Sequence, residues 1–559
     1  MHAAGVVRSC LMFLLPFLIL VQSMYLEHSQ GPVKYPSLLD ASLETLSDGL
    51  QKKVFTSVDL VKAYILRIAE VQDDFHAVLE LNPDAVSIAS SLDLERARGH
   101  IRGPLHGIPV LLKDLIGTSD NMNTTAGSYA LLGAKLPRDS TIARKLREAG
   151  VILLGKTSVS EWANFRAFNS SNGWSARSGQ AYGPYYPGQD PWGSSTGSAI
   201  GAALGLAWAS IGTETDGSIV RPASANNVVG IKPTSGLTSR NLVIPVSSHL
   251  DTIGTFARTV KDAAYLLQAI AGKDVEDNYT LAIPNIPNYV KACQISALRG
   301  VRIGVPRNAI VLGSTPTFEP AQSVAFENAL DILRDAGATI VDNTNFTAAE
   351  EFWTSSIPGQ LVSADFIVEL PKYLSKLTRN PNNITDLSSL RAFVQQFPLE
   401  EYPDRDTGIW DVTLLGFNST SPEFWATYQK NVFYGSEGGL LGALDRHNLD
   451  AVVMPADYAA HHFAAPVGAP VVTVPMGEYP AGSTVVKDSR GLVERAEGIP
   501  FGLSFLGRRW SEKRLIGMAY AFEQRTNFRA KLKPFKVPSK EIADVIGSYR
   551  RLPASLVTG

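Results

Sequence analysis

The sequence predicts an α/β fold that forms one large domain. Segments with helical periodicity alternate with short, β-branched runs, a pattern typical of helices packed on a parallel or mixed sheet. Of the 559 residues, 45% are hydrophobic, which is enough for a large core, although the length alone would also allow two or more domains. Because no Gly/Ser-rich linker divides the chain, we expect a single domain.

The N-terminal segment has the layout of a secretory signal. Arg8 precedes the apolar run "LMFLLPFLILV", and Val21 and Ser23 occupy positions −3 and −1 of a cleavage site. A proline interrupts the run, which is shorter than the ~18–20 residues that a spanning helix needs. We expect residues 1–23 to be a cleaved signal peptide and residues 24–559 to be secreted, without stable membrane association. An uncleaved membrane anchor is the alternative.

The composition narrows the class of partners. The formal net charge is −2 and no basic block occurs, which argues against a nucleic-acid partner. Cys10 would leave with the signal, so the mature chain would keep only Cys293 and no internal disulfide. Six glycosylation sequons indicate an extracellular glycoprotein, and they begin at Asn123, Asn169, Asn278, Asn345, Asn383 and Asn418.

The helices and strands can be placed in chain order. Residues 37–71 have the periodicity of two helices, with Ser57 as the N-cap of the second. Strands are expected at "HAVLELN" and "HGIPVLLKD", on either side of the charged helix "SLDLERARG". A helix, a glycine stop and a buried strand are expected in "DSTIARKLREAGVILLGKT", and "PAQSVAFENALDILRDAGATIVDNT" repeats that unit. Further strands are expected at "VRIGVP", "LDAVVMP" and "APVVTVPMG".

Residues 347–431 differ from the rest of the chain. They are rich in aromatic residues, proline and asparagine, and their periodicity is weak. We interpret them as a variable insertion that packs over the core and forms one wall of a substrate cleft.

The chain is dense in small residues between Gly193 and Ser239. Gly197, Gly201 and Gly205 recur every four residues, so one helix face is nearly bare. Each glycine costs about 1 kcal/mol of helix stability relative to alanine. We therefore expect this helix to pack closely against a neighbouring element and to support a site rather than form it.

The stretch "GTETDGSIV" places Ser218 behind a turn that contains Gly217. Such a turn lets consecutive backbone N–H groups point inward, as an oxyanion hole requires. The donors would come from Thr215, Asp216, Gly217 and Ser218, although an ordinary Gly-Ser turn is the simpler alternative. The nearest histidine in sequence is His249, so a base for Ser218 has to come from elsewhere in the chain.

Lys113 is a candidate for that base. It closes the apolar strand "HGIPVLLKD", where a lysine usually extends its ammonium group to solvent. If it is instead buried beside serines, desolvation lowers its pKa and it can act as a neutral general base. The local sequence is compatible with both interpretations.

A second candidate nucleophile is Ser195 in "GSSTG", which fits the G-x-S-x-G elbow of α/β-hydrolases. That elbow requires a strand directly before it, yet the preceding "YGPYYPGQDPW" contains three prolines and two glycines and is unsuited to a buried strand. The elbow also needs a downstream histidine, from among His249, His447, His461 and His462.

Several motifs together resemble the amidase signature family, namely "GPLHGIPVLLKD", "GSSTGS", "GTETDGSI", "VGIKPTSGLTSR" and "DTIGTFARTVKDAA". The resemblance covers residues 38–526 and, with the secretory signal, is to secreted fungal and bacterial members. It implies one α/β domain with a mixed sheet of about eleven strands enclosed by helices. It also implies hydrolysis of carboxamides by a Ser–Ser–Lys triad, which falls here on Lys113, Ser194 and Ser218, with a cis bond between Gly193 and Ser194.

Three positions depart from the commonest pattern of that family. Asp216 and Asn227 stand where glycines are frequent. Val220 occupies the place of a frequent arginine, and Arg221 comes one position later. These departures concern the oxyanion loop and the substrate contacts rather than the reaction class.

The resemblance therefore predicts an amidase in which Ser218 forms an acyl-enzyme. Ser194 and Lys113 would relay its proton, and Ser195 would support the network by hydrogen bonding. Two alternatives stay open: a histidine-dependent hydrolase of the esterase or lipase type built on Ser195, and a catalytically silent member of the fold.

No cofactor or metal is expected. The nine histidines show no ligand spacing apart from the adjacent His461 and His462, which we interpret as part of a polar loop. The expected partner is a small-molecule or peptide amide substrate, and the enzyme is expected to be a monomer or homodimer.

Overall fold

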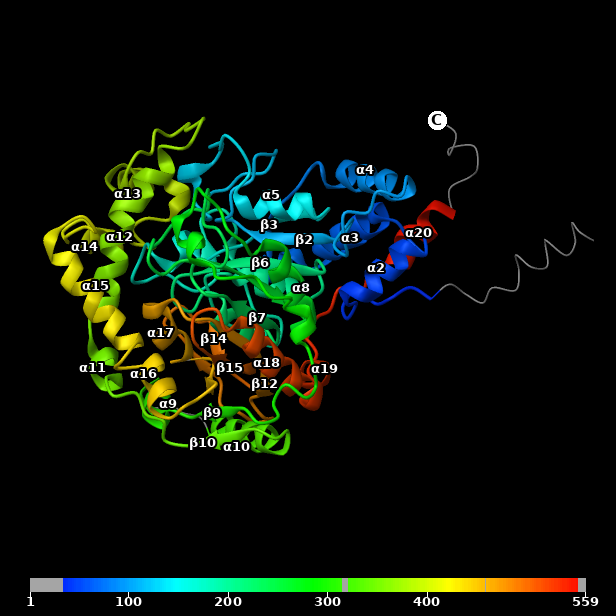
Figure 1. Ribbon diagram of the computed structural model, residues 1–559. Coiled ribbons are helices and arrows are strands. Elements are labelled where there is room, and N and C mark those ends of the chain that lie inside the picture. The colour runs from blue at the N-terminus through cyan, green and yellow to red at the C-terminus, as the bar shows by residue number, and fades with distance from the viewer. Residues whose placement is uncertain (1–33, 314–319, 458, 551–559) are drawn as a thin grey trace, which may run out of the picture.

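The computed structural model describes residues 34–313, 320–457 and 459–550, and the predicted signal peptide lies outside them. Within the described residues, eleven strands form one mixed sheet that helices surround (Figure 1). The predicted fold class is confirmed. The sheet has the order β1-β3-β2-β6-β8-β7-β12-β15-β11-β9-β10, with bounds β1 Val78–Leu81, β2 Pro109–Lys113, β3 Ile152–Thr157, β6 Ala209–Glu214, β7 Val229–Lys232, β8 Thr252–Ala257, β9 Arg302–Gly304, β10 Thr339–Val341, β11 Ala451–Pro455, β12 Val471–Glu478 and β15 Pro500–Leu506.

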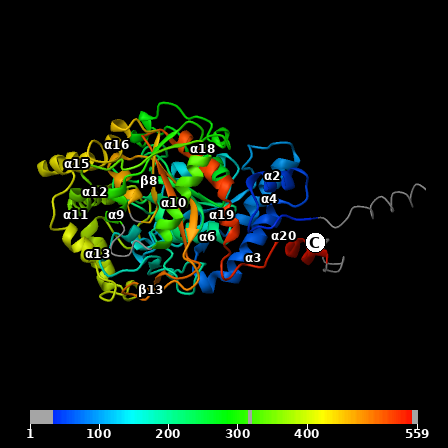
Figure 2. The ribbon, with the colours of Figure 1, turned by 90° about the horizontal axis from the view of Figure 1, so that it is seen from below.

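Helices cover both faces of the sheet, and two short hairpins lie outside it. Helices α11–α15 gather on the opposite side of the molecule from α2–α4 and α20 (Figures 1 and 2). The hairpins pair β4 (Trp174–Ser175) with β5 (Gly179–Gln180) and β13 (Val486–Lys487) with β14 (Val493–Arg495). The α-helices are α2 Leu43–Gln51, α3 Ser57–Phe75, α4 Ala85–Ala97, α5 Thr141–Glu148, α6 Thr196–Ala203, α7 Val220–Ala225, α8 Val260–Ile270, α9 Arg307–Gly313, α10 Pro320–Asp335, α11 Ala349–Thr354, α12 Ile357–Leu374, α13 Leu387–Gln396, α14 Gly408–Thr413, α15 Pro422–Gly435, α16 Leu440–Arg446, α17 Ala460–Ala464, α18 Glu512–Thr526, α19 Phe528–Lys531 and α20 Ile542–Arg550.

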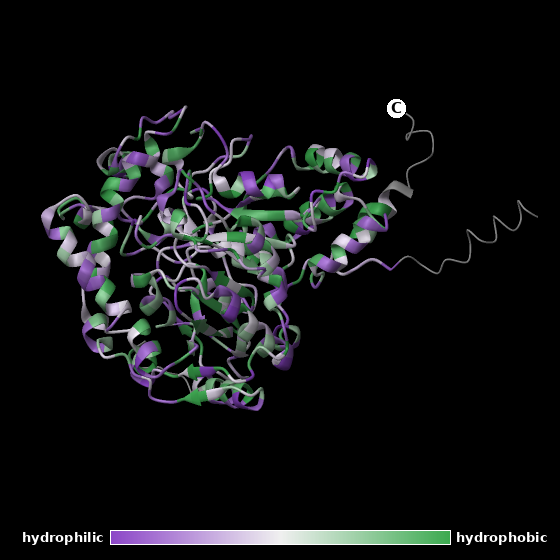
Figure 3. Cartoon of the chain, viewed as in Figure 1, coloured by the Kyte–Doolittle hydropathy of each residue, from purple (hydrophilic) through white to green (hydrophobic). Residues whose placement is uncertain are grey.

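The core is built on the central strands. Every residue of β2, β3, β6 and β15 is buried, because helices shield the sheet on both faces. Figure 3 shows hydrophobic residues on the strands and mixed hydropathy on the outer helices. Among the described residues, no helix is long and apolar enough to cross a membrane.

Helix α3 begins one residue earlier than the sequence predicts. Thr56 is its N-cap, and a capping box joins the Thr56 and Asp59 side chains to each other's backbone N–H groups. The assignment of Ser57 as N-cap is therefore wrong, because only Thr56 has an acidic residue three positions further on to complete the reciprocal pair.

Helix α6 packs closely, as its glycines predict. A Cβ at Gly197 would lie 2.1 Å from the Ala77 carbonyl oxygen, and one at Gly201 would lie 3.1 Å from Leu111 Cδ1. A Cβ at Gly205 would also meet a neighbour, 2.6 Å from the Leu38 carbonyl oxygen, but Gly205 lies beyond the last turn of the helix and has a φ of +61°. Its left-handed conformation ends the helix instead of extending the bare face.

The segment 347–431 is mostly helical, which its weak periodicity does not predict. It contains α11–α14 and most of α15. A buried ion-pair cluster joins it to the rest of the molecule: Arg166 Nη1 lies 2.5 Å from Glu161 Oε1 and 3.0 Å from Glu400 Oε2. Helix α12 of this segment reaches the cavity described below.

Candidate active site

Sheet topology brings Lys113 and Ser218 to the same edge. Lys113 is the last residue of β2, and Ser218 follows the end of β6 by four residues. Strands β2 and β6 are parallel neighbours, so their carboxyl ends meet at one edge. Ser194 directly precedes Ser195, the N-cap of α6, and the Gly193–Ser194 peptide bond is cis.

The three side chains form a continuous hydrogen-bonded series. Lys113 Nζ lies 2.8 Å from Ser194 Oγ, and Ser194 Oγ lies 2.9 Å from Ser218 Oγ. Lys113 Nζ also donates to the Thr213 carbonyl and contacts Thr213 Oγ1 at 2.9 Å. Thr213 was not identified from the sequence, although its place in "GTETDGSI" is a usable signal. The hydrogen-bond partners of Lys113 Nζ, on Ser194 and Thr213, are therefore all uncharged oxygens.

The environment of Lys113 favours its neutral form. The side chain is fully buried, and this burial lowers its pKa to about 7, although the charges of Asp251 and Glu214 oppose the shift. The predicted alternative, a lysine that extends to solvent, is wrong for this residue. A large share of the lysine is then unprotonated near neutral pH.

The turn before Ser218 presents free backbone donors. Among the described residues, no protein group accepts from the N–H of Asp216, Gly217 or Ser218. Gly217 has a φ of +92°, a left-handed conformation that glycine adopts without steric cost. The turn can therefore offer consecutive N–H groups to one acceptor.

Two acidic side chains hold the ends of this turn, Glu214, which is buried, and Asp251, which is half-buried. Glu214 Oε2 accepts from the N–H groups of Ile219, at 2.6 Å, and Val220, at 2.9 Å. On the other side, Thr215 Oγ1 donates to Asp251 Oδ1 at 2.6 Å. Neither acid was identified as a site residue from the sequence. Glu214 lies within "GTETDGSI" and Asp251 opens "DTIGTFARTVKDAA", but neither motif indicates that the two acids meet at one turn.

The Ser195 hydroxyl bonds to the backbone of β6. Its Oγ donates to the Thr213 carbonyl at 2.9 Å and accepts from the Thr213 N–H at 3.3 Å. Residues 182–192, directly before "GSSTG", form no strand and have only isolated bridges, Gly183 with Gln189 and Gln189 with Val493. The elbow that a histidine-dependent hydrolase requires is thus not formed.

The candidate histidines do not approach Ser195. His249 Nδ1 pairs with Asp365 at 2.9 Å, and His447 caps the end of α16. His461 and His462 lie in the short helix α17, and His461 is buried. Their assignment to a polar loop is therefore wrong, because the local sequence gives no sign of the acidic partner with which they pair.

That partner is Asp216, the first departure from the family pattern. His461 Nδ1 lies 2.6 Å from Asp216 Oδ1, and His462 Nδ1 lies 2.7 Å from Asp216 Oδ2. Burial opposes ionisation of Asp216, but the two imidazoles hold its pKa well below the usual range.

The other departures are also accommodated. Asn227 has a φ of +54°, and asparagine is among the few non-glycine residues that tolerate this region. Val220 is buried at the start of α7. The Arg221 guanidinium lies over the Trp192 ring, 3.5 Å from its centroid.

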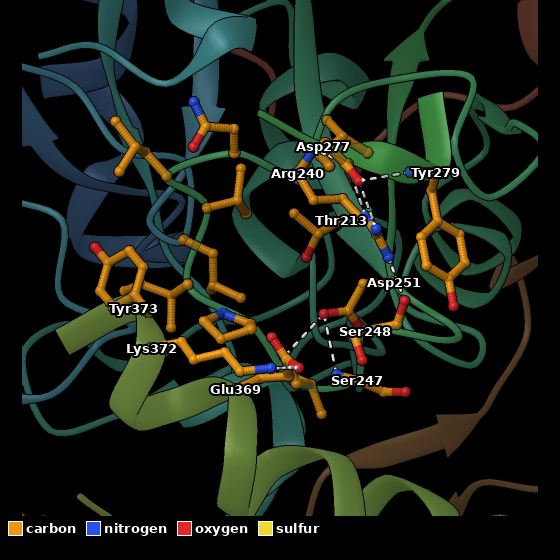
Figure 4. A pocket seen from close by; sticks show the side chains of 18 of the residues that line it. Thr213, Arg240, Ser247, Ser248, Asp251, Asp277, Tyr279, Glu369, Lys372 and Tyr373 are labelled. Atoms are coloured by element: carbon orange, nitrogen blue, oxygen red, sulfur yellow. Dashed lines mark hydrogen bonds and ion pairs between the residues drawn. The ribbon is translucent and has the colours of Figure 1, made fainter. Parts of the chain in front are cut away.

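A cavity of about 610 Å³ adjoins the end of β6. Thr213 and Thr215 line it, and α12 supplies Lys372 and Tyr373; Thr213 and the two α12 residues are labelled in Figure 4. Arg240 also lines it, but its guanidinium is paired with Asp277. The remaining wall is largely the segment 241–253.

Comparisons with known proteins agree with this geometry. Residues 59–516 match the Amidase family. A putative amidase of Arthroderma benhamiae is 52% identical over 535 residues, which cover 91% of this chain and 90% of that protein. The native peptide amidase from Stenotrophomonas maltophilia has a similar structure, with a TM-score of 0.80, 36% identity and coverage of 91% of this chain and 100% of that chain. The structure of the peptide amidase PAM in complex with the competitive inhibitor chymostatin is also similar. Its TM-score is 0.79 and its sequence identity 37%, and the match covers 88% of this chain and 98% of that chain.

The fold and these relationships define a hydrolase of carbon–nitrogen amide bonds. The chain belongs to the amidase family.

Proposed function

We propose that this amidase works through a Ser218 acyl-enzyme, with Ser194 and Lys113 as its proton relay. The observation that carries the proposal is the buried series of 2.8 Å and 2.9 Å contacts that ends at Ser218. A hydroxyl at the end of such a relay can lose its proton as it attacks, which is how a weak nucleophile is activated.

In the acylation step, Ser218 Oγ bonds to the amide carbonyl carbon. Its proton moves to Ser194 Oγ, and the Ser194 proton moves to the lone pair of neutral Lys113. The carbonyl oxygen becomes an oxyanion, which the free N–H groups of the preceding turn can bind.

The tetrahedral intermediate formed by this attack then collapses, which breaks the C–N bond. Ser194 gives its proton to the departing nitrogen and regains one from Lys113, so the relay returns to its starting state. Water then attacks the acyl-enzyme and passes its proton along the same series. The products are a carboxylic acid and ammonia or an amine, and Ser218 is restored.

The cavity supports amides of peptide size as the first substrates to test. Its volume of about 610 Å³ is within the ~300–1,000 Å³ of sites for small organic ligands. Two structural relatives are peptide amidases with 36% and 37% identity. We therefore rank C-terminal peptide amides above fatty, aryl and small aliphatic amides.

A labelling experiment and a substrate panel test the function together. A fluorophosphonate should modify wild-type enzyme at Ser218, as peptide mapping would show, and Ser218→Ala should lose the label. Ammonia release should be fastest with an N-acyl dipeptide amide. A label on Ser195 would contradict the mechanism, whereas labelling of Ser218 with a preference for another amide would correct only the substrate class.

We also propose that the mature enzyme is an extracellular glycoprotein that starts at Met24. The surface supports glycosylation, since four sequon asparagines are exposed and those at positions 123 and 418 are half-buried. N-terminal sequencing and glycosidase treatment of secreted material test this. A chain that still begins at Met1 and sediments with membranes would mean that the segment is an anchor.

A further inference from the structure

The middle of the turn before Ser218 is held by helix α17 rather than by the sheet. The two ends of the turn are fixed by Asp251 and Glu214. Asp216 lies between them, and its side chain extends to two imidazoles on α17. This contact lies outside the serine–lysine series and has no part in the relay.

The two imidazoles converge on one carboxylate in a way that adjacent helical residues seldom achieve. Successive side chains on a helix point about 100° apart, yet Nδ1 of His461 and Nδ1 of His462 each meet one oxygen of Asp216. His462 is also fixed by edge-on contact with Trp353, at 5.7 Å between ring centroids.

His461 also limits where the next residue can lie. A Cβ at Gly217 would be 2.9 Å from Nδ1 and Cε1 of the His461 ring, so the ring rests against the Gly217 backbone. One buried imidazole therefore contacts two of the three residues whose N–H groups are free to bind an oxyanion.

His461 is suited to this place as a neutral donor. Burial and the neighbouring His462 lower its pKa to about 4. Because the carboxylate of Asp216 only accepts hydrogen bonds, the Nδ1 position carries the proton. Nε2 of His461 is buried without a protein partner, an arrangement that costs stability and argues that the residue is kept for its other nitrogen.

We propose that His461, through Asp216 and with support from His462, is a positioning residue that sets the oxyanion-binding turn of this amidase. The inference rests on the proposed Ser218 mechanism. It assigns a purpose to the aspartate that stands where glycine is frequent: the flexibility of a second glycine is replaced by a side chain anchored to α17.

A double-mutant cycle tests the proposal. Asp216→Gly and His461→Ala should each lower kcat by about 10–10²-fold, the range expected for a misplaced catalytic group, and leave KM within about twofold. The double variant should be no worse than the poorer single variant, because both changes release the same contact.

His461→Asn retains an N–H near the Nδ1 position and should recover most of the activity. His447→Ala is the matched control outside the cluster.

A second readout separates positioning from general destabilisation. Boronic acids form a tetrahedral adduct with the nucleophile, so their affinity should fall in parallel with kcat, while the affinity for the carboxylic acid product should not change. Thermal unfolding identifies variants that fail to fold. Multiplicative losses in the double variant, or a His461→Asn enzyme that is folded but no better than His461→Ala, would overturn the proposal.

The alternative use of the cluster is as a metal site, since its three donor groups lie within 4.8 Å of one another. The wild-type enzyme should keep its activity after dialysis against EDTA, and added Zn²⁺ should not raise it. Loss of activity on chelation with recovery by Zn²⁺ would show that the cluster is a metal centre and would overturn the positioning role of His461.

If wild-type Ser218 takes no fluorophosphonate, the proposed Ser218 mechanism itself fails. If wild-type Ser218 is labelled and the Asp216 and His461 variants turn over normally, only the positioning role of His461 fails.

Discussion

The neighbouring strands β2 and β3 each carry a buried lysine near the carboxyl end, and the two lysines meet different partners. Lys113 pairs in register with Thr157, whereas Lys156 pairs with Leu112. Because side chains alternate between the faces of a sheet, the offset of one residue sends the two ammonium groups to opposite faces. Lys113 reaches Ser194, and Lys156 donates to the Ile116 carbonyl and to Thr124.

The comparison shows that burial alone does not make a base. Burial lowers the pKa of Lys113 to about 7 and that of Lys156 to about 8. Only the hydroxyl beside Lys113 leads on to a second serine next to free backbone N–H groups. Lys156 instead joins β3 to the chain beyond β2, which is a structural task.

The largest expected effect is at the end of the series. Ser218→Ala should lower kcat by about 10⁴–10⁶-fold, the loss typical of an essential nucleophile, and abolish fluorophosphonate labelling. Ser195→Ala loses only contacts to Thr213 and should still be labelled. Mass spectrometry of both variants gives the result, and a Ser195→Ala enzyme without label would favour the elbow mechanism.

The two lysines provide the next test. Lys113→Met should lower kcat by about 10²–10⁴-fold, the usual contribution of a positioned base, with little effect on folding. Lys113→Arg should not rescue it, since its pKa above about 12 leaves no neutral form. Lys156→Met should lower the thermal midpoint but keep kcat within a few-fold. Equal kinetic losses in both methionine variants would remove the distinction.

A smaller effect should follow from the charge beside the base. The negative charge of Asp251 raises the pKa of Lys113, so Asp251→Asn should lower it. The active form has neutral lysine, and the pH–kcat midpoint should therefore move to lower pH by a fraction of a unit. Asparagine keeps one of the two acceptor oxygens, so either the bond from Thr215 or the bonds from Val246 and Ser247 are lost, which should lower the plateau. A midpoint that moves upward would show that the sign of this coupling is wrong.

An effect on binding alone should come from the cavity wall. Tyr373→Leu removes an aromatic ring from α12 and should raise KM about tenfold for an N-acyl dipeptide amide, the cost of roughly 1.4 kcal/mol of binding. Acetamide is too small to reach the wall, and its kinetics should be unchanged. Equal changes for both substrates would mean that the variant disturbs the centre itself.

The sequence was sufficient for the fold class and for strands such as β2, β3 and β12, whose apolar β-branched runs are unambiguous. It did not indicate β6 or β8, because "ASIGTE" and "TIGTFA" mix glycine with polar residues. Their strand character depends on pairing with neighbours in the sheet, which no local pattern encodes.

The candidate site also has some residues that the local sequence indicates and others that it does not. Lys113, Ser194 and Ser218 lie in short motifs, so resemblance could place them. Asp251 and His461 reach the oxyanion turn from distant segments, and such contacts become visible only in three dimensions. The cavity wall on α12 has no motif at all.

The central claim is that Lys113 in its neutral form draws the proton from Ser218 through Ser194. The most direct measurement is the pH dependence of Ser218 modification by an uncharged fluorophosphonate, which reports acylation without product release. The wild-type rate should rise with pH through a midpoint near 7, because deprotonation creates the base. Lys113→Met should be slow and nearly flat across that range, whereas Lys156→Met should keep the wild-type profile. A Lys113→Met enzyme that retains the wild-type rate and midpoint would contradict the account.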